Sequence, residues 1–320
     1  MVEILLGKKE QISFSDVESP YGTAATPVEI LARNASFDPS RDNQNIIPVK
    51  GASTDVLDVP VREFGQETWG GTLSYVPQNW KFLKFVLLAE ANKVTDTAPT
   101  PYTHTFTNTK TGLASFTLER AIQATTSRVR RYEGCQVDNY ALSWDASDVG
   151  SYLNATATVF AEDGNNGTSV TSLVAPTTEG YKPRYTALTL EGSSVAYLRS
   201  GTFTINNGLT DGMYADSSVA RLKKESAPIL RTFNLTAVAQ YEDDTFFDML
   251  DSADILGSTN TLVFQRAAND NLTVTFTGAY LNTAPDPTNL EGANTVNLNI
   301  DINSAAFVAV DTLSDYVTFT

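Results

Sequence analysis

The sequence has very few of the residues on which most enzyme and metal chemistry depends. Its 320 residues include one cysteine, Cys135, and one histidine, His104. A single cysteine can build neither a disulfide framework nor a cysteine-based zinc site within one chain. A Cys/His nucleophile would need both groups in contact and a third residue to orient them. Cys135 follows Gly134 in a strand pattern, where a small buried apolar side chain is expected. We therefore predict no catalytic residue, no metal site and no cofactor.

Basic residues and long apolar runs are also scarce. The chain has 22 lysines and arginines against 37 acidic residues, a net charge of -15. Phosphate binding needs clustered cations, so this balance disfavours a DNA-binding protein. The most apolar run, 82–91, contains Lys84 and Glu90 and is shorter than the ~20 residues that span a bilayer. The N-terminus lacks the apolar core of a secretory signal, so neither export nor a membrane partner is predicted.

Alternating apolar and polar residues are abundant. The clearest runs lie at 113–121, 152–160, 200–206, 271–278 and 295–303. In the last run, every second residue from 296 to 302 is aliphatic while the residues between them are Asn or Asp. This period of two is typical of strands with one buried face and one wet face. The sequence therefore predicts a mainly β fold.

Two segments show helical spacing instead. Apolar residues recur at i, i+3, i+4 and i+7 in both, at Phe82, Phe85, Val86 and Ala89 and, 164 residues later, at Phe246, Met249, Leu250 and Ala253. Asn79 suits the N-cap of the first segment, and the carboxylates at 242–244 suit the start of the second better than they suit a metal or acid/base site. We predict two short amphipathic helices.

Further matches keep the same order along the chain, as a tandem duplication would. Trp69 and Leu73 match Phe233 and Ala237, Phe37 matches Phe203, YEGCQVD at 132–138 matches FTGAYLN at 276–282, and Leu153, Ala155, Ala157 and Val159 match Val296, Leu298, Ile300 and Ile302. We predict a first domain at 1–165, a linker at 166–184 and a second domain at 185–320. Each domain is expected to be a β-sandwich or split barrel with one short flanking α-helix.

Four segments together resemble a known family: SPYGTAATP at 19–27, GGTLSYVPQNWKFLKFVLLAEA at 70–91, RYEGCQV at 131–137 and SGTFTINNGL at 200–209. They are similar to the major tail tube proteins of long-tailed, siphophage-type bacteriophages, in the branch where the tube domain is duplicated. The resemblance implies a structural virion protein, made in the host cytoplasm, that is no enzyme. It implies rings stacked into a hollow tube that conveys DNA without binding it specifically.

The resemblance also implies partners and symmetry. Single-domain tube proteins form six-membered rings, so a chain with two copies is expected to close with three chains, giving a pseudo-hexamer. Other tail proteins, namely the tape measure, terminator and baseplate, are implied as partners. Long connections at 38–60 and 207–228 suit contact with a neighbouring ring, since structureless loops of this length are usually functional. The candidates for contact with the neighbouring ring are the apolar residues of the first connection, Ile46, Ile47, Val49, Leu57 and Val59. The N-terminal arm at 1–20 is a second candidate.

In a tube that conveys DNA, the net negative charge would also have a functional role. Carboxylates in the lumen would repel phosphates, whereas a basic lumen would hold them. Asp138, Asp145 and Asp301 lie on predicted hairpin strands and are the candidates for lumen-facing acidic residues.

Three alternatives remain open at the level of sequence. A tail-terminator or baseplate ring protein would share the fold. A two-domain β-sandwich adhesin or carbohydrate-binding module could stack exposed Tyr and Trp on sugars. A glycosidase would need two carboxylates facing each other across a cleft, and no such pair stands out.

Overall fold

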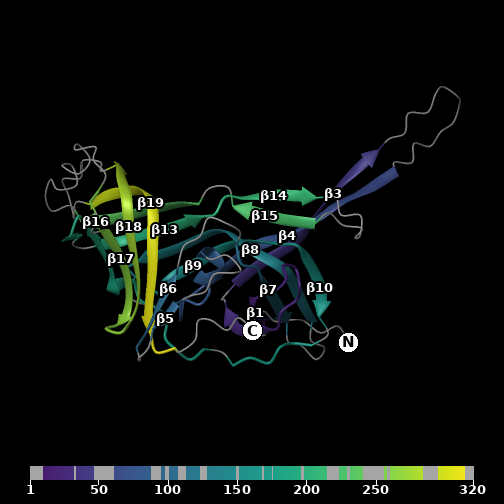
Figure 1. Ribbon diagram of the computed structural model, residues 1–320, viewed down its shortest axis with the longest axis horizontal. Coiled ribbons are helices and arrows are strands. Elements are labelled where there is room, and N and C mark those ends of the chain that lie inside the picture. The colour runs from purple at the N-terminus through teal and green to yellow at the C-terminus, as the bar shows by residue number, and fades with distance from the viewer. Residues whose placement is uncertain are drawn as a thin grey trace, which may run out of the picture.

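A computed structural model describes residues 10–31, 34–46, 61–87, 95–97, 101–106, 113–122, 128–148, 151–167, 169–174, 176–195, 198–214, 223–228, 231–240, 256–257, 260–283 and 295–313. The described part of the chain is mainly β, and all of its strand pairs in the large sheet are antiparallel (Figure 1). The mainly β fold class predicted from the alternating runs is confirmed.

The strands follow one another along the whole chain. They are β1 (Glu10–Val17), β2 (Pro27–Leu31), β3 (Asn34–Ile46), β4 (Val61–Tyr75), β5 (Thr95–Thr97), β6 (Tyr102–Phe106), β7 (Phe116–Ile122), β8 (Arg128–Asp145), β9 (Asn154–Ala161), β10 (Asp163–Gly167), β11 (Thr186–Leu190), β12 (Ser193–Ser194), β13 (Leu198–Asn206), β14 (Leu209–Tyr214), β15 (Lys223–Pro228), β16 (Thr232–Gln240), β17 (Asn260–Ala267), β18 (Asp270–Thr283) and β19 (Thr295–Asp311). The described helices are α1 (Leu83–Leu87) and the short 3-10 helix η2 (Pro183–Tyr185).

The strands before residue 168 form one set of pairings. The first part of β8 pairs with β7 and β10, and β7 pairs in turn with β1, which pairs with β2. The second part of β8 pairs with β9, which pairs with β4, which pairs with β3. A single long strand therefore passes from one sheet into a second.

The strands after residue 185 pair in a matching order. The first part of β18 pairs with β17 and with the end of β19, and β17 pairs with β11, which pairs with β12. The last residues of β18 pair with the start of β19, which pairs with β16, which pairs with β13. β18 thus occupies in the second set the place that β8 has in the first.

Both long strands bend at a glycine of positive φ. Gly134 in β8 has φ 64° and Gly278 in β18 has φ 61°, a conformation that L side chains rarely adopt. Four residues after each glycine the register shifts, between Val137 and Asn139 in one strand and between Leu281 and Thr283 in the other. A β-bulge of this kind bends a strand and strengthens its twist. The YEGCQVD and FTGAYLN motifs therefore occupy the same structural position.

The pairings refine one match made from the sequence. Through the two bulges, the buried residues Val296, Leu298, Ile300 and Ile302 of β19 correspond to Ala155, Ala157, Val159 and Ala161 of β9, two residues later than the sequence match placed them. A shift of two residues keeps every side chain on the same face of a strand, so the alternation alone could not reveal it.

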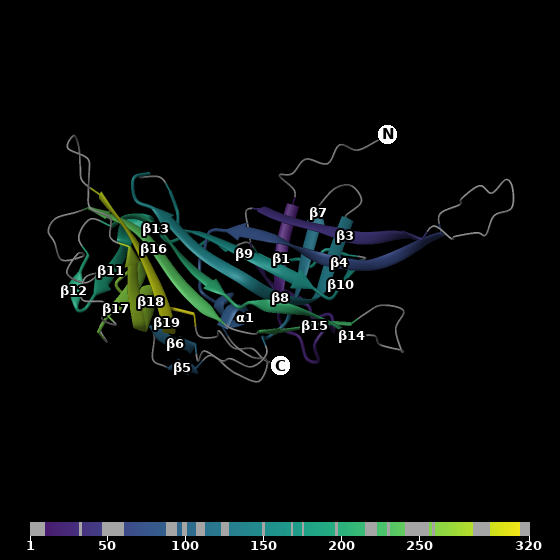
Figure 2. The same ribbon diagram turned by 90° about the horizontal axis from the view of Figure 1, so that it is seen from above.

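The two sets join along the edge strands β8 and β13. Their pairing runs from Asn139 opposite Asn206 to Asp145 opposite Ser200. It makes one eight-stranded sheet in the order β3, β4, β9, β8, β13, β16, β19, β18. A second connection is made by β6, which leaves the first set to pair with the end of β19 (Figure 2).

The apolar residues of both sets form one contiguous core. Helix α1 packs into it: Phe82, just before the helix, contacts the rings of Phe14 and Phe116 at 5.5 and 5.4 Å between centroids. The Asn79 side chain accepts a hydrogen bond from the Lys81 N–H at 3.0 Å, so it caps the turn that leads into the helix. Of the predicted apolar quartet, Ala89 lies outside the described residues, as does the whole second predicted helix.

Candidate functional site

The eight-stranded sheet has one apolar face and one polar face. The apolar face meets the core, whereas the polar face carries Thr72, Ser74, Ser143, Asp145, Asn154, Thr156, Thr158, Ser200, Thr202, Thr204, Asn234, Thr236, Asn297, Asn299 and Asp301 at alternating positions. These residues come from six strands of both sets, namely β4, β8, β9, β13, β16 and β19. The polar face is therefore continuous across the junction of β8 with β13.

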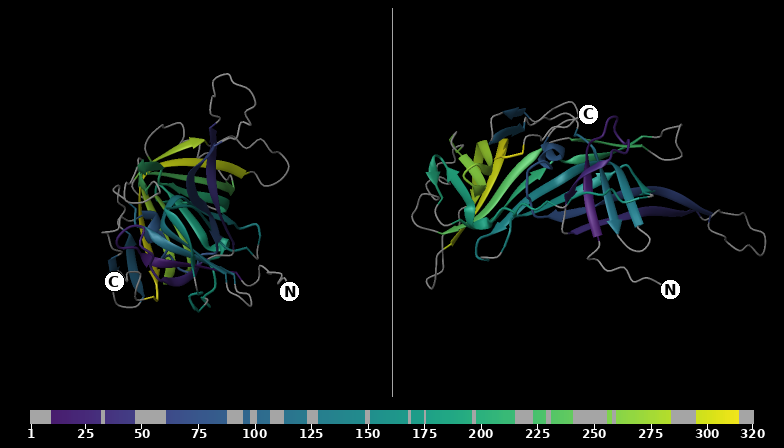
Figure 3. Two further views of the ribbon diagram at one scale, coloured as in Figure 1. Left: turned by 90° about the vertical axis from the view of Figure 1, so that its right-hand side faces the viewer. Right: turned by 90° about the horizontal axis from the view of Figure 1, so that it is seen from below.

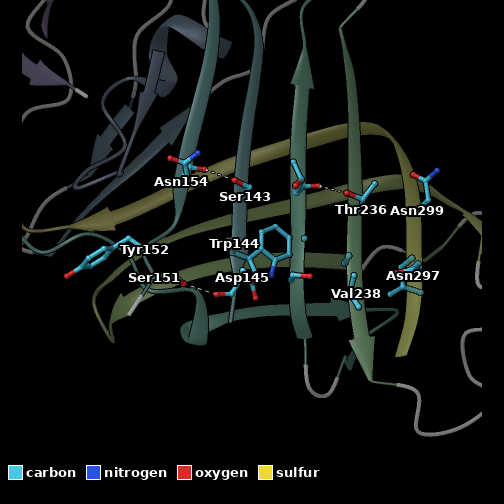
Figure 4. A pocket seen from close by; sticks show the side chains of 15 residues that line it. Ser143, Trp144, Asp145, Ser151, Tyr152, Asn154, Thr236, Val238, Asn297 and Asn299 are labelled. Atoms are coloured by element: carbon cyan, nitrogen blue, oxygen red, sulfur yellow. Dashed lines mark hydrogen bonds between the residues drawn. The ribbon is translucent and has the colours of Figure 1, made fainter. Parts of the chain in front are cut away.

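Neutral polar side chains line up in rows across this face (Figure 4). One row runs from Asn154 through Ser143, Thr202 and Thr236 to Asn299, because each is opposite the next in the strand register. The rows line an open hollow of about 610 Å³ over the junction. A surface of hydroxyl and amide groups offers hydrogen bonds but no net charge.

The alternating positions named above carry two charges, the carboxylates Asp145 and Asp301. Asp145 is exposed, and hydrogen bonds from the Ser147 hydroxyl and from the Ser147 N–H hold its pKa below the usual value. The exposed Arg199 of β13 lies close enough to Asp145 to help lower this pKa. Asp301 accepts from Asn234 Nδ2 at 2.8 Å and from Asn282 Nδ2 at 2.6 Å. Lysine and arginine do not occur at the alternating polar positions named above. Two of the three carboxylates predicted to face the lumen, Asp145 and Asp301, therefore lie on the same polar face of the sheet.

Asp138, the third acidic candidate, has a different environment. It lies at the bulge of β8, and its Oδ1 accepts a hydrogen bond from the Leu209 N–H at 2.8 Å. Its backbone oxygen accepts from the Asn207 N–H at 2.7 Å. The side chain of Asp138 is thus engaged at the point where β14 begins.

Two long hairpins project from the same end of the molecule, as Figure 1 and the view from below in Figure 3 show. The first is β3 with β4, paired from Asn34 opposite Ser74 to Ile46 opposite Val61. The second is β14 with β15, a separate two-stranded sheet. The connection predicted as a loop from residue 38 is therefore strand as far as Ile46, since the β4 backbone supplies partners. Ile47, Val49, Leu57 and Val59 lie outside the described residues, as does the arm at 1–9.

The base of the second hairpin contains residues that sequence reasoning did not single out. Asn207 is fully buried and bonds across the two sets of strands, to Val86 and Val137. The only local signal is the pair Asn207–Gly208, a dipeptide typical of turns. Its partners are distant in the sequence, so the pattern could predict the turn and not the contact.

Cys135 and His104 lie in separate surroundings. Cys135 is fully buried, burial raises the pKa of its thiol well above the usual value, and its Sγ donates to the Tyr132 carbonyl. His104 in β6 is also buried, with Nε2 3.0 Å from Asp311 Oδ1 of β19. In the described ranges no three His, Cys, Asp or Glu side chains are grouped so that they could hold a metal ion. Nor does any described helix have the length and apolar character to cross a membrane.

Comparison with known proteins agrees with this arrangement. The model of one protein family, described as phage tail tube protein, matches residues 16–309. A search of curated proteins found no match. A match over nearly the whole chain includes both sets of strands, the polar face and the bases of both hairpins. The chain therefore belongs to the phage tail tube protein family, and it is a structural protein of the phage tail.

Proposed function

We propose that three copies of this chain close into a ring, and that the rings stack into the hollow tube through which phage DNA passes. The two sets of strands are, in this proposal, two tandem tube domains, at 1–165 and 185–320 with a linker between them, and each has one flanking helix. Six domains then surround the lumen. Tape measure, terminator and baseplate proteins are the expected partners of such a tube.

The observation that carries the proposal is the junction of β8 with β13. One edge of the first set is joined there to one edge of the second by a ladder of seven residue pairs. The eight-stranded sheet still has two outer edges, β3 and the end of β18, and neither has a second neighbour among the described strands beyond the isolated bridge of Leu256 to Ala279. Unpaired edges favour association with another chain.

The two outer edges correspond to the two edges already joined. β18 has the place of β8. β3 has the place of β13, because β3 pairs with β4, the neighbour of β9, and β13 pairs with β16, the neighbour of β19. An equivalent junction between chains would therefore pair β18 of one copy with β3 of the next. Repeating the junction around an axis closes the sheet into a barrel without edges.

The correspondence also predicts the register of the junction between chains. Asn139 and Thr283 are each the first paired residue after the bulge. Asn206 follows Ile205, the residue opposite Phe233, and Ser40 follows Pro39, the residue opposite Trp69, so Asn206 and Ser40 are equivalent. Because Asn139 is opposite Asn206 within the chain, Thr283 should lie opposite Ser40 of the next copy. Pro285 and Pro287 follow Thr283 and lack N–H donors, so we expect this ladder to be shorter.

The polar face supports its assignment to the lumen. Rows of Thr, Ser and Asn with two carboxylates, Asp145 and Asp301, would let DNA slide, because the face has no cations at its described alternating positions to hold phosphates. The open hollow over the junction lies on this same face, lined by the side chains that Figure 4 shows.

The two hairpins support stacking. Both project from one end of the molecule, so in a ring with its axis along that direction they would reach the adjacent ring. The apolar residues of the connection at 38–60, Ile46, Ile47, Val49, Leu57 and Val59, are proposed to pack against that ring, with the arm at 1–20 as a second contact.

Cysteine cross-linking tests the ring. The double variant Ser40→Cys with Thr283→Cys, treated with a short bis-maleimide during assembly, should give covalent dimers and trimers and nothing larger on a denaturing gel. Each single variant should remain monomeric, because native Cys135 is fully buried. The matched control, Asn139→Cys with Asn206→Cys, should cross-link within one chain and keep the monomer mass.

Electron microscopy of the same samples completes the test. Striated tubes with three chains per ring are expected. Tubes that form without any cross-link between Ser40→Cys and Thr283→Cys would contradict the register, and covalent products of six chains would contradict the three-chain ring. Rings that never stack would instead indicate a terminator or baseplate protein.

A further inference from the structure

The second hairpin, β14 with β15, is attached to the molecule differently from the first. β3 and β4 stay paired from the eight-stranded sheet to Ile46, so the sheet itself sets the direction of that hairpin. β14 and β15 pair only with each other among the described strands. An isolated two-stranded ribbon has little stability of its own. Something other than the sheet must therefore orient this hairpin.

The chain leaves the sheet at Asn207 and Gly208. β13 ends at Asn206, Gly208 has a positive φ of 55°, and β14 begins at Leu209. The Gly208 N–H donates to Asn206 Oδ1 at 2.8 Å, which closes a tight turn. Turns of this kind can adopt several directions unless the residues around them are fixed.

Asn207 is fixed by hydrogen bonds from its backbone and from its side chain. Its N–H donates to the Asp138 oxygen at 2.7 Å, and its side-chain Nδ2 donates to the Val137 and Val86 oxygens at 2.8 and 3.1 Å. Its Oδ1 accepts from Arg231 Nε at 2.5 Å. The residue has no exposed surface. A buried amide with its hydrogen bonds made holds the backbone firmly, since breaking one leaves an unsatisfied group.

Two further residues hold the hairpin from its two strands. Asp138 Oδ1 accepts from the N–H of Leu209, the first residue of β14. On the other side Arg231, three residues after β15 ends, donates to Asn207 and, through Nη1, to the Leu87 oxygen at 3.0 Å. Val86 and Leu87 are the last described residues of α1, and both of their carbonyl oxygens accept hydrogen bonds from the hairpin base. The hairpin base is thus bonded to the bulge of β8 and to α1.

We propose that Asn207, Asp138 and Arg231 form a clamp that sets the direction of the β14–β15 hairpin for contact with the adjacent ring. The inference rests on the proposed stacking of rings. The clamp should affect stacking and not ring closure. The β8–β13 ladder, on which the proposed ring junction is based, begins at Asn139 and is made by backbone groups, so it does not need the Asp138 carboxylate. Asp138, predicted as a lumen-facing carboxylate, acts here as a positioning residue.

A matched pair of variants at Asp138 tests the clamp. Asp138→Ala removes the acceptor for the Leu209 N–H, whereas Asp138→Asn keeps a side-chain oxygen in the same place. Arg231→Met keeps the apolar stem and removes both guanidinium bonds. Asp148→Ala, an exposed carboxylate removed from the clamp, controls for the loss of charge.

Two measurements are made on each variant: the yield of rings and of tubes by electron microscopy, and the rate of tryptic cleavage at Lys223 and Lys224 of β15. Loss of a hydrogen bond to a charged group shifts an equilibrium by about tenfold. Asp138→Ala and Arg231→Met should therefore form rings, be cleaved about tenfold faster and elongate tubes several-fold more slowly. Asp138→Asn and Asp148→Ala should behave like the wild type.

The outcomes separate the clamp from the proposed function. Unchanged cleavage in Asp138→Ala, or faster cleavage with normal tube growth, would overturn the clamp. Wild-type protein that forms no tubes would refute the stacking of rings, and the cleavage rates would then decide whether the clamp orients the hairpin in the free chain.

Discussion

Gly201 lies at the junction of the two sets of strands with no room for a side chain, and its replacement by alanine is predicted to destabilise the protein. A Cβ at this position would lie 2.4 Å from Cζ2 of Trp144 and 2.5 Å from the Thr236 oxygen. Real Cβ atoms essentially never come within 3.0 Å of another heavy atom. Either the Trp144 ring or the backbone of β16 must therefore move.

Neither neighbour can move cheaply. Trp144 is 3% exposed and packs edge-on against Phe264 of the second set, at 5.6 Å between ring centroids. Thr236 lies in the middle of β16, which is paired on both sides. Overpacking of this kind costs about 1–3 kcal/mol. Since each kcal/mol lowers Tm by about 2–4 °C in large domains, Gly201→Ala should melt roughly 2–12 °C below the wild type.

Thermal unfolding followed by circular dichroism measures this effect. Gly257→Ala is the matched control, because a Cβ there meets nothing within 4 Å, and its Tm should stay within about 1–2 °C of the wild type. If Gly201→Ala had the same Tm as Gly257→Ala, β13 would not pack as closely between β8 and β16 as the structure indicates. The junction would then be a poor guide to the contact between chains.

Two further predictions concern charge. Burial raises the pKa of Glu18 above its usual value of 4.5, although hydrogen bonds from Thr117 and from the Gly134 N–H oppose the shift. The folded state therefore holds this proton more tightly than the unfolded chain. The stability that Glu18 contributes should be present below pH 4.5 and be lost as the pH rises through the folded pKa. The Tm of the wild type relative to Glu18→Gln should fall over that range, and a difference that rises or stays constant would contradict this. On the polar face that is proposed to line the lumen, the double variant Asp145→Lys with Asp301→Lys should slow DNA ejection, most strongly at low salt where screening is weak. Glu133→Lys, on the other part of β8, is the control. A double variant that ejects DNA at the wild-type rate at low salt would refute an acidic, DNA-facing surface.

Local periodicity was enough to predict the fold class and much of the strand pattern. A strand with one buried face must alternate, so the residues from 296 to 302 could be assigned to a wet face or a buried face from their order in the chain alone. The glycine of YEGCQVD and FTGAYLN could be matched by its spacing to neighbouring aliphatic residues. Asp145 and Asp301 could be assigned to a wet face for the same reason.

Other features depended on contacts between segments far apart in the chain. The bulge position was needed to align β9 with β19, because alternation is unchanged by a shift of two residues. Loop composition at 38–46 suggested an unpaired connection, whereas the β4 backbone pairs with it. Local sequence carries no information about a partner that distant.

The tertiary structure alone decided what Asp138 and Asn207 do. By spacing, Asp138 resembled the other carboxylates of the hairpin strands, but the bulge turns its side chain to the Leu209 N–H. Asn207 is bonded to Val86, 121 residues away, and to Arg231. Hydrogen bonds act over about 3 Å, so they depend on which strands the fold brings together and not on the order of residues along the chain. The sequence by itself determined the alternation and the turns; the pairing of β8 with β13 decided which polar groups meet.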